Sequence, residues 1–513
     1  MSSSMLPIEF HAPTEIPARE GWLSGVWRFV VAALLIPQLP TLLWCLATHS
    51  TVYFRGWINL EYLVLLGIAF LFPSWWTITL LTVEMCIALV EPIATLYYIS
   101  PRDALPSIRY LLLLPAPRLI GYACLLIVYA IGVAVALRAT LGRYRRKDAK
   151  YMVALALACC LLALSTDLLF GRFSRFHIGK RLGDVDARQM FIARSPAGSI
   201  WFINYQLRNA GKRSSIPPRL LSSALAQAMA EVPAGSKPDV VLVLTESWGL
   251  ANDDRVNQAQ MQPYRNPAID NLYRVQTGSV QFAGGTTSGE TRELCGDSQG
   301  LSSLSAPDEY FAGCWPARLK SAGYRTLAVH GFSSSMFHRW EWYRRFGFEN
   351  SAFLPDLMQA GAAMCYGAFS GICDADAAQW ISDRLLNHRD GRPDFVHWVT
   401  LNSHLPVPDV GGNLSLQQCA EVGIDREKHL CSWFLLVLRV HESVASLALR
   451  PELRPTVFVI VGDHAPPFIR EDTRSQFSQT RVPFVVLIPR SIPLQAQGPK
   501  PRQRQLLRPP ISE

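Results

Sequence analysis

The chain has 513 residues, of which 50% are hydrophobic and 17% are charged, and it carries a formal net charge of +9. This composition is too apolar for an ordinary soluble protein and indicates that part of the chain lies in a membrane. The sequence contains no zinc-finger spacing, RNP pattern or long run of Lys and Arg, so it excludes the common nucleic-acid-binding modules.

Five long apolar runs follow an N-terminal segment at residues 1–26, which the orientation argued below makes cytoplasmic. Each run is close to the ~20 residues that an α-helix needs to cross the ~30 Å hydrocarbon core of a bilayer. The first run is too long for a cleavable signal peptide, and four more follow it. The sequence therefore predicts a five-helix transmembrane domain over residues 27–170, with spans at 27–47, 58–74, 76–98, 118–138 and 150–170.

A basic loop between the fourth and fifth runs sets the predicted orientation. It reads LRATLGRYRRKDAK and holds six Lys or Arg residues in fourteen positions. The positive-inside rule places this loop in the cytoplasm. Everything after residue 171 then lies outside, as a juxtamembrane linker at 171–236, a folded domain at 237–492 and a basic, disordered tail at 493–513.

The eleven cysteines divide between the two parts of the chain. Five fall in the apolar runs, where cysteine acts as a small hydrophobic residue. The other six follow residue 290, and an even set in the polar half indicates disulfides in an oxidising compartment. Zinc binding is the alternative, although no CxxC spacing supports it. Because nearest-neighbour pairing closes the shortest loops, the predicted disulfides are Cys295–Cys314, Cys365–Cys373 and Cys419–Cys431.

From residue 237 the pattern changes to short, continuous apolar strands that each end abruptly in polar residues. Helix-like runs such as PARLKSAG separate the strand segments KPDVVLVLTESWG, RTLAVHG, DFVHWVTLNSH and TVFVIVGDHAPP. Continuous rather than alternating strands indicate a sheet that helices cover on both faces. The sequence thus predicts an α/β domain with a mostly parallel sheet, which binds ligands beyond the carboxyl ends of its strands.

The polar strand ends supply Glu246, His330, His404, Asp463 and His464. Carboxylates and imidazoles that converge from separate strands suit a divalent metal ion. The Asp463-His464 pair alone is more typical of a turn carboxylate and a surface imidazole, but four strands that end this way favour a metal site. His330 fits either a substrate contact or a cap on its strand.

The stretch GGTTSGETRELC, residues 284–295, combines several hydroxyl side chains with glycines. A solvent-exposed loop is the simplest interpretation. The alternative is a nucleophile held where a charged group must approach the backbone, because glycine leaves room for that approach.

Together these segments resemble the alkaline phosphatase superfamily, and within it the membrane-bound lipoteichoic acid synthases and phosphoethanolamine transferases. VVLVLTESWG resembles the opening strand that ends in a metal-binding Glu, and VIVGDHAPP resembles the closing metal motif. The resemblance implies metal ligands at Glu246, Asp463 and His464. It implies a metal-bound nucleophile from the Gly-x-Thr pattern at Thr287, with Thr286 as the next choice.

Two further segments resemble substrate-binding motifs of the same family. HGFSSSMFHRWEWYRRFGFEN implies that Phe337 and Arg339 bind the substrate. TLNSHLPV implies that His404 holds a phosphate oxygen and acts as a general acid. The match is incomplete, because two glycines replace the transferases' Cys-Gly before the nucleophile and APPF follows the Gly-Asp-His motif. Gly289 also stands where the synthases have an acidic residue.

The resemblance implies a phosphotransferase of the bacterial inner membrane, with a multi-pass anchor and a catalytic domain on the periplasmic, extracytoplasmic side. One divalent ion, Zn²⁺ or Mn²⁺, would serve as its cofactor. The enzyme would move a phosphoglycerol or phosphoethanolamine headgroup from a membrane phospholipid to a hydroxyl of an envelope glycan through a phospho-threonine intermediate. Two alternatives stay open: a phosphodiesterase or sulfatase-like hydrolase on the same site, and a non-catalytic lipid-binding regulator. The formylglycine signature of sulfatases is missing from the nucleophile segment.

Overall fold

The structure, a computed structural model, describes most of the chain apart from its ends and several connecting segments. The described residues are 27–49, 58–72, 74–99, 107–141, 149–170, 193–194, 222–233, 235–387, 391–409, 413–424 and 427–493. The predicted N-terminal segment, most of the predicted linker and nearly all of the predicted tail therefore lie outside the described residues.

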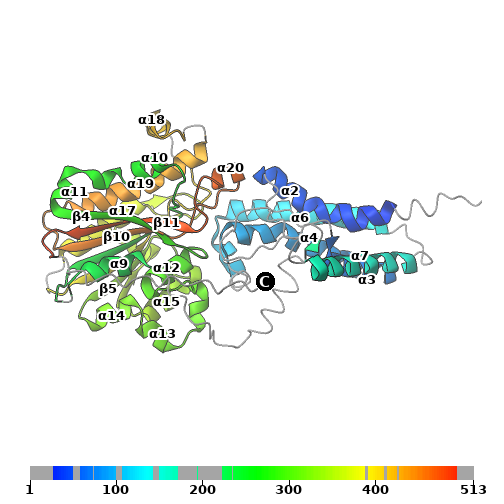
Figure 1. Cartoon of the computed structure of the whole chain (residues 1–513), viewed down its shortest axis with the longest axis horizontal. Coiled ribbons are helices and arrows are strands. Elements are labelled where there is room, and N and C mark those ends of the chain that lie inside the picture. The colour runs from blue at the N-terminus through cyan, green and yellow to red at the C-terminus, as the bar shows by residue number, and fades with distance from the viewer. Residues whose placement is uncertain are drawn as a thin grey trace, which may run out of the picture.

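Helices occupy all five predicted apolar runs (Figure 1). The first run, residues 27–48, is helical throughout and includes η1 (Val31–Leu35), η2 (Ile36–Gln38) and α2 (Leu39–Thr48). The others are α3 (Leu60–Leu71), α4 (Trp75–Leu96), α6 (Ala116–Leu141) and α7 (Ala149–Phe170), with a short strand pair of β1 (Ile58–Asn59) and β2 (Ala193–Arg194). α3 packs against α7 and α4 against α6, around an apolar core that includes Phe29, Leu66, Leu81 and Leu137.

The N-terminal helices differ in how well each could cross a membrane. Among the described residues of this region, the helices Trp27–Thr48 and Ala116–Leu141 are long and apolar enough to do so. α3 has only 12 residues, which corresponds to about 18 Å at 1.5 Å per residue, less than the ~30 Å hydrocarbon core. The N-terminal part thus contains several apolar helices, and the complete five-helix transmembrane domain stays a prediction.

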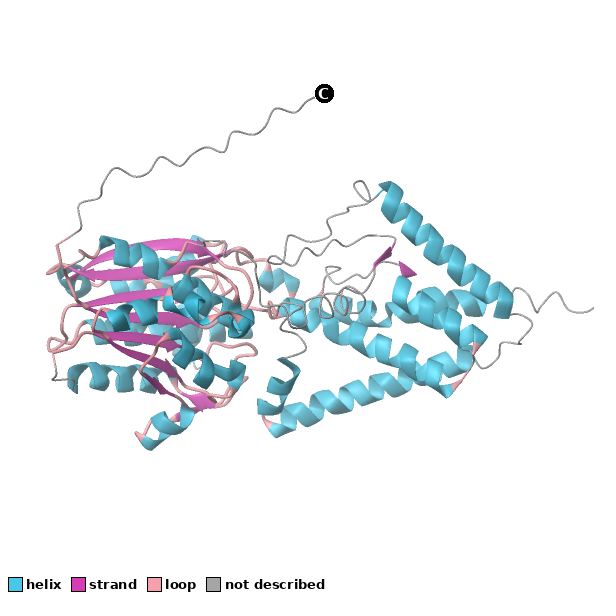
Figure 2. Cartoon of the chain, turned by 90° about the horizontal axis from the view of Figure 1, so that it is seen from below, coloured by secondary structure: helices cyan, strands magenta, loops and turns pink. Residues whose placement is uncertain are grey.

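A seven-stranded sheet with the order β4-β11-β10-β3-β9-β5-β6 organises the second part of the chain (Figure 2). Four adjacent parallel strands correspond to the segments read from the sequence: β10 (Thr456–Gly462), β3 (Asp239–Thr245), β9 (Asp394–Val399) and β5 (Arg325–His330). β6 (Asn350–Ala352) extends the sheet in parallel, whereas β11 (Arg481–Pro489) and β4 (Tyr273–Gln281) pair antiparallel at the other edge. The sheet is therefore mixed, and it is parallel where it carries the predicted site.

Helices cover both faces of this sheet, as the continuous strands predict (Figure 1). One face carries α10 (Asp254–Gln260), α17 (Asp374–Asn387) and α19 (Lys428–Ala448), and the other carries α9 (Ala224–Glu231), α12 (Thr286–Cys295) and α14 (Trp315–Ser321). Every residue of β3, β9 and β10 is buried between these layers. Shorter helical elements complete the domain: η4 (Gln262–Arg265), α11 (Pro267–Leu272), η5 (Gly300–Ser305), α13 (Asp308–Ala312), α15 (Arg339–Phe346), α16 (Leu354–Gln359), α18 (Asn413–Glu421) and α20 (Glu471–Arg474).

α19 has the length and hydropathy of a membrane span, but it is a core helix of this domain. Of its most apolar window, 72% is buried, and Trp433, Val437 and Val444 pack into the main hydrophobic core. Arg439 and Glu442 lie on the exposed side of the helix. A hydropathy scan alone cannot separate such a helix from a lipid-facing one, because both require apolar surfaces.

Strand register brings the ends of the parallel strands together. Thr245 of β3 pairs with Gly462 of β10, so Glu246 and Asp463 leave neighbouring strands side by side. Val399 of β9 pairs with residues of both β3 and β5, including His330. The turns that carry the predicted site residues therefore begin at one edge of the sheet.

The structure confirms all three predicted disulfides, Cys295–Cys314, Cys365–Cys373 and Cys419–Cys431. The second links β7 (Met364–Cys365) to the residue after β8 (Gly371–Ile372). All six sulfurs are used in these bonds, which removes the zinc alternative for this set of cysteines.

Candidate metal and nucleophile site

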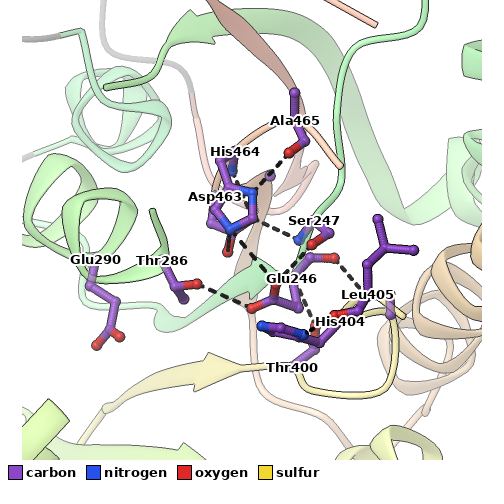
Figure 3. A network of polar contacts seen from close by, with 12 residues as sticks. Glu246, Ser247, Thr286, Glu290, Thr400, His404, Leu405, Asp463, His464 and Ala465 are labelled. Atoms are coloured by element: carbon purple, nitrogen blue, oxygen red, sulfur yellow. Dashed lines mark hydrogen bonds and ion pairs between the residues drawn. The ribbon is translucent and has the colours of Figure 1, made fainter. Parts of the chain in front are cut away.

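Glu246, Asp463 and His464 form a compact cluster at the carboxyl edge of the sheet (Figure 3). One candidate ligand atom from each residue lies within 4.8 Å of the other two, and all three residues are buried. Nε2 of His464 is 3.3 Å from Oδ2 of Asp463 and 3.7 Å from Oε1 of Glu246. Two carboxylates and one imidazole at this spacing can share one divalent cation.

The two oxygens of the Asp463 carboxylate have different surroundings. Oδ1 accepts hydrogen bonds from the backbone N–H groups of Ser247 at 2.7 Å and His464 at 2.6 Å. Oδ2 is buried and accepts no hydrogen bond from the described residues. Burial raises the pKa of Asp463 to about 7, and the neighbouring carboxylate of Glu246 raises it as well. A cation at Oδ2 would offset both effects, so the residues present fit a bound metal ion.

The backbone fixes which nitrogen of His464 is available to a metal. Nδ1 lies 2.9 Å from the carbonyl oxygen of Ala465, and a carbonyl can only accept a hydrogen bond, so Nδ1 carries the hydrogen. Nε2 faces the two carboxylates and holds the lone pair. This use of the second ring nitrogen is typical of metal-binding histidines.

Ser247 supports both carboxylates, and the sequence analysis did not identify it. Its φ of 56° lies in the left-handed region, which residues other than glycine rarely adopt. In this conformation its N–H donates to Asp463, while its hydroxyl donates to Oε1 of Glu246 at 2.8 Å. Nε1 of Trp433 donates to the backbone carbonyl of Ser247 at 2.9 Å. Only its position directly after Glu246 could have signalled this role.

The GGTTSGE stretch is not a surface loop, because it begins α12 with Gly285 as the N-cap. The hydroxyl of Thr286 donates to Oε2 of Glu246 at 3.2 Å, as the dashed line in Figure 3 shows. Thr287, the expected nucleophile, is directed toward Gly300, where an added Cβ would lie 3.1 Å from the hydroxyl of Thr287. The structure therefore brings Thr286, rather than Thr287, to the metal cluster.

Gly289 allows α12 to approach the strand end that carries Asp463. A Cβ at this position would lie 3.0 Å from Cβ and 3.1 Å from Cα of Asp463. An acidic side chain, which the resemblance would lead one to expect here, would require Asp463 or α12 to shift by a few tenths of an ångström. The departure from the synthase pattern thus has a steric reason in this chain.

Two further predicted site histidines, His404 and His330, are alike: in each, Nδ1 donates to a backbone carbonyl and Nε2 is left with the lone pair. Nδ1 of His404 is 2.8 Å from the carbonyl oxygen of Leu405, and Nδ1 of His330 is 3.0 Å from that of Val399. Burial, together with the neighbouring His464, lowers the pKa of His404 to about 4. Burial likewise lowers the pKa of His330 to about 3. Near neutral pH, Nε2 of each imidazole therefore holds a lone pair that can accept a hydrogen bond.

The structure places Arg339 in a buried ion pair. Nη2 of Arg339 is 2.6 Å from Oε1 of Glu290, and the two side chains are 2% and 0% exposed. Burial opposes ionisation of Glu290, but Arg339 and His397 outweigh it and lower the pKa of Glu290 to about 2. Phe337, in η6 (Met336–His338), has its ring centre 5.2 Å from the guanidinium. Here Arg339 anchors the helix of Thr286, and substrate binding by Arg339 and Phe337 stays a prediction.

Residues that follow the N-terminal helix α4 also reach the cluster. The ring of Tyr98 is 5.3 Å from that of His464, and the ring of Tyr97 is 6.0 Å from that of His404. Hydropathy could not signal these contacts, because both tyrosines belong to the end of a predicted apolar run.

The family comparison fits the architecture and the cluster described above. The sequence model of the sulfatase family matches residues 238–504, which is more than half of the chain. The chain belongs to the sulfatase family. All three candidate metal ligands lie inside the matched range. A search of curated proteins finds no match.

Several solved structures are similar to this sulfatase-family chain. The lipoteichoic acid synthase LtaP from Listeria monocytogenes is 13% identical, with 51% of this chain and 70% of that chain covered and a TM-score of 0.33. The Streptococcus pyogenes phosphoglycerol transferase GacH, in complex with sn-glycerol-1-phosphate, is 17% identical, with coverages of 51% and 71% and a TM-score of 0.32.

One similar structure extends over the N-terminal helices as well. It is the integral membrane protein lipooligosaccharide phosphoethanolamine transferase A (EptA) from Neisseria meningitidis, which is 16% identical, with 88% of each chain covered and a TM-score of 0.44. The sulfatase family model confirms the sulfatase-like family that the sequence motifs predict. Likenesses this distant do not identify the substrate of the sulfatase-family chain.

Proposed function

We propose that the chain is an integral membrane phosphotransferase with an extracytoplasmic catalytic domain. It takes a phosphoglycerol or phosphoethanolamine headgroup from a membrane phospholipid and passes it to a hydroxyl of an envelope glycan. The observation that carries the proposal is the hydrogen bond from Thr286 to Glu246 inside the cluster of Glu246, Asp463 and His464. An alcohol held against metal-binding carboxylates is the arrangement of an activated nucleophile.

Thr286 takes the role of nucleophile in this proposal, in place of Thr287. It is the first residue of α12, so its hydroxyl lies beside the free N–H groups of a helix start, which favour an incoming phosphate. The ion pair of Glu290 with Arg339 anchors the same helix one turn later. The position of the hydroxyl therefore depends on buried contacts.

The proposed reaction has two steps. In the first, Oγ1 of Thr286 bonds to phosphorus, the bond from phosphorus to the diacylglycerol oxygen breaks, and the threonine proton ends on the departing diacylglycerol. In the second, the glycan hydroxyl bonds to phosphorus, the phospho-threonine bond breaks, and the proton of the glycan hydroxyl ends on Oγ1. In this proposal His404, neutral and with its lone pair at Nε2, is the base for the glycan hydroxyl in the second step, in place of the general-acid role that the resemblance implies.

Glu246, Asp463 and His464 would hold one divalent cation, and an oxygen-rich site with one imidazole suits Zn²⁺ or Mn²⁺. Such a cation supplies Lewis-acid chemistry, because it lowers the pKa of an alcohol and neutralises charge on a phosphate oxygen. The unpartnered Oδ2 of Asp463 supports this assignment.

Two features support a phospholipid as the donor. α6 leaves apolar side chains such as Leu125, Val128 and Ile131 exposed, which suits contact with lipid. The end of α4 and the start of α6 contact the catalytic domain, so the opposite end of α6, before the basic loop, fits the cytoplasmic side. A site tethered to the bilayer works at a high effective concentration of lipid donor.

Headgroup release from labelled phospholipid tests the proposal. The full chain is placed in nanodiscs with headgroup-labelled phosphatidylethanolamine or phosphatidylglycerol, with and without a glycan acceptor. Wild type and Thr287→Ala are expected to release label when glycan is present, and Thr286→Ala is not. Release that needs no glycan would indicate the hydrolase, and equal release by wild type and Thr286→Ala would remove the catalytic proposal. The mass of the peptide that contains Thr286 identifies the transferred group.

A further inference from the structure

Three tyrosines from the N-terminal part of the chain contact three residues of the candidate site. Tyr98 faces His464 and Tyr97 faces His404, as described above. Tyr110, in η3 (Ile108–Leu113), lies edge-on to Phe337 with a ring separation of 5.0 Å. The segment between α4 and α6 thus touches a metal ligand, a general base and a predicted substrate contact.

Tyr98 is held firmly beside the metal ligand. Its residue is 4% exposed, its hydroxyl donates to Oε1 of Gln479 at 2.9 Å, and its ring packs edge-on against Phe282 at 5.3 Å. Its φ of 55° is in the left-handed region, which costs energy for a tyrosine. These contacts set the ring of Tyr98 beside the imidazole of His464, whose Nδ1 donates to the carbonyl of Ala465.

Tyr97 is arranged in the same way around His404. The two rings are nearly parallel, at 14°. The hydroxyl of Tyr97 donates, at 3.4 Å, to the carbonyl oxygen of Leu405, which also accepts from Nδ1 of His404. The carbonyl of Tyr97 lies over the start of α12, where an added Cβ on Gly285 would be only 3.3 Å away. Tyr97 therefore contacts both the base and the backbone that presents the nucleophile.

We propose that the tyrosine turn, residues 97–98, is a working part of the catalytic site. Tyr98 is a positioning residue that holds the imidazole of His464 for the cation, and Tyr97 is a positioning residue that holds His404 for proton transfer. The metal site then reaches full affinity only when the ring of Tyr98 lies against His464. This inference rests on the proposed function, because it assigns both histidines their roles in the same reaction.

Simple docking of the two parts does not account for these contacts. Arg118, near the start of α6, already links them through hydrogen bonds to the carbonyls of Gly367 and Ala368 at 2.7 and 3.0 Å. A docking contact has no need to touch a metal ligand, whereas a positioning contact must. The two roles therefore predict different effects on metal binding.

Metal affinity of the full chain in detergent separates the two roles. Zn²⁺ affinity is measured by competition with a chelator, and the absorption of bound Co²⁺ reports the geometry of the ligands. Tyr98→Leu is expected to weaken Zn²⁺ binding about 10-fold or more and to change the Co²⁺ spectrum, since the loss of a residue that orients a ligand typically costs 10–100-fold. Tyr98→Phe keeps the ring, so its Zn²⁺ affinity should lie between those of Tyr98→Leu and wild type.

Tyr97→Leu and Arg118→Met serve as the matched comparisons. Tyr97→Leu is expected to lower kcat while Zn²⁺ affinity stays at the wild-type value, because His404 is not a metal ligand. Arg118→Met should leave both Zn²⁺ affinity and the Co²⁺ spectrum unchanged. Wild-type affinity in Tyr98→Leu, or an equal loss of affinity in Arg118→Met, would overturn the inference.

A fourth variant separates failure of this inference from failure of the proposed function. Asp463→Asn removes a ligand outright and must lose Zn²⁺ binding if the metal site is correct. If Asp463→Asn binds Zn²⁺ like wild type, the proposed function fails. If Asp463→Asn loses the metal while Tyr98→Leu and Tyr98→Phe keep it, only the role of the tyrosine turn fails. Should Tyr98→Leu fail to fold, a wild-type spectrum and affinity in Tyr98→Phe would still count against the role, because that variant releases the ring from Gln479.

Discussion

The catalytic domain buries charged side chains, whereas the N-terminal helices expose apolar ones. Buried groups of the catalytic domain include Glu290, Arg292, Glu293, Arg339 and Asp463. The helix α6 exposes Ile120, Leu125, Val128, Ile131 and Val135. A buried charge persists when a partner charge, hydrogen bonds or a metal compensates it, and an exposed apolar surface persists when its solvent is apolar. The two parts are thus built for different surroundings, and the tyrosine turn lies where they meet.

The largest predicted effect comes from removing the charge that the metal cluster requires. Asp463→Asn is expected to lower headgroup transfer at least ~1,000-fold, or about 4 kcal/mol of activation free energy, because Oδ2 would no longer hold the cation. The matched control, Asp472→Asn, removes an exposed carboxylate that pairs with Arg470 and should leave transfer unchanged. Transfer rates and bound metal per chain, measured by elemental mass spectrometry, check the result. Full metal content in Asp463→Asn would contradict it.

Breaking the buried ion pair between Arg339 and Glu290 tests whether this pair stabilises the catalytic domain. Arg339→Met leaves Glu290 buried without its partner and is expected to lower the free energy of unfolding by about 3–5 kcal/mol. The double variant Arg339→Met/Glu290→Leu should recover most of that loss. Arg470→Met, which breaks an exposed pair with Asp472, should cost less than about 1 kcal/mol. Denaturant titration of the folded chain measures all three.

The same pair has a defined pH dependence. The pKa of Glu290 is lowered to about 2 from an ordinary value of 4.5, so its ionised form is stabilised by folding. This stability is fully present above pH 4.5 and is lost as the pH falls toward 2. The difference in stability between wild type and Arg339→Met should therefore shrink over that window, and a constant difference would contradict the assignment.

A charged substitution on each exposed apolar surface contrasts the two parts directly. Ile131 on α6 and Leu272 on the catalytic domain are 59% and 49% exposed. If lipid surrounds α6, Ile131→Arg costs about 2.5–3.5 kcal/mol of insertion free energy, whereas Leu272→Arg stays within about 0.5 kcal/mol. The share of each variant in the membrane fraction after alkaline extraction, and the thermal stability of the extracted protein, check this. Equal tolerance at both positions would place water around α6.

The smallest predicted effect concerns a disulfide next to the contact between the two parts. Removing Cys365–Cys373 with serines at both positions is expected to cost about 2–3 kcal/mol of stability, as loop-closure entropy for a short loop predicts. This loop contains the carbonyls to which Arg118 donates. Thermal unfolding of the double-serine variant, with Cys419–Cys431 removed as a control, measures the cost. If the loop couples the two parts, removing Cys365–Cys373 should lower stability more than removing Cys419–Cys431 in the wild-type background. In the Arg118→Met background the two removals should then cost the same.

The catalytic domain could be predicted from sequence because its signals are local. Four apolar strands with polar ends, three cysteine pairs and the polar residues Glu246, Asp463 and His464, which the structure brings together, can each be read from a few neighbouring residues. The antiparallel edge of β11 and β4 could not, because pairing direction depends on how the chain returns to the sheet. The structure also places Thr286 against Glu246, whereas the sequence pattern favoured Thr287, because two adjacent threonines fit the same Gly-rich segment.

Contacts between distant parts of the chain could not be predicted from the sequence for a different reason. Nothing in the order of residues indicates that Tyr98 meets His464, because the two are separated by most of the chain and belong to different predicted domains. The pairing of Arg339 with Glu290 likewise depends on the packing of two helices. Hydropathy reports the solvent that a segment prefers. It carries no information on which buried group the segment will contact.

The apolar helix α19 has a consequence for how the protein is made. In the proposed topology the catalytic domain is exported through the inner membrane as an unfolded chain. α19 then passes through the translocon with the hydropathy of a membrane span, and a segment of that kind can act as a stop-transfer signal. Arg439, near its middle and exposed in the folded domain, adds about 2.5–3.5 kcal/mol to the cost of entering the bilayer. In that topology, the arginine that faces water in the finished protein also favours completion of export over arrest in the membrane.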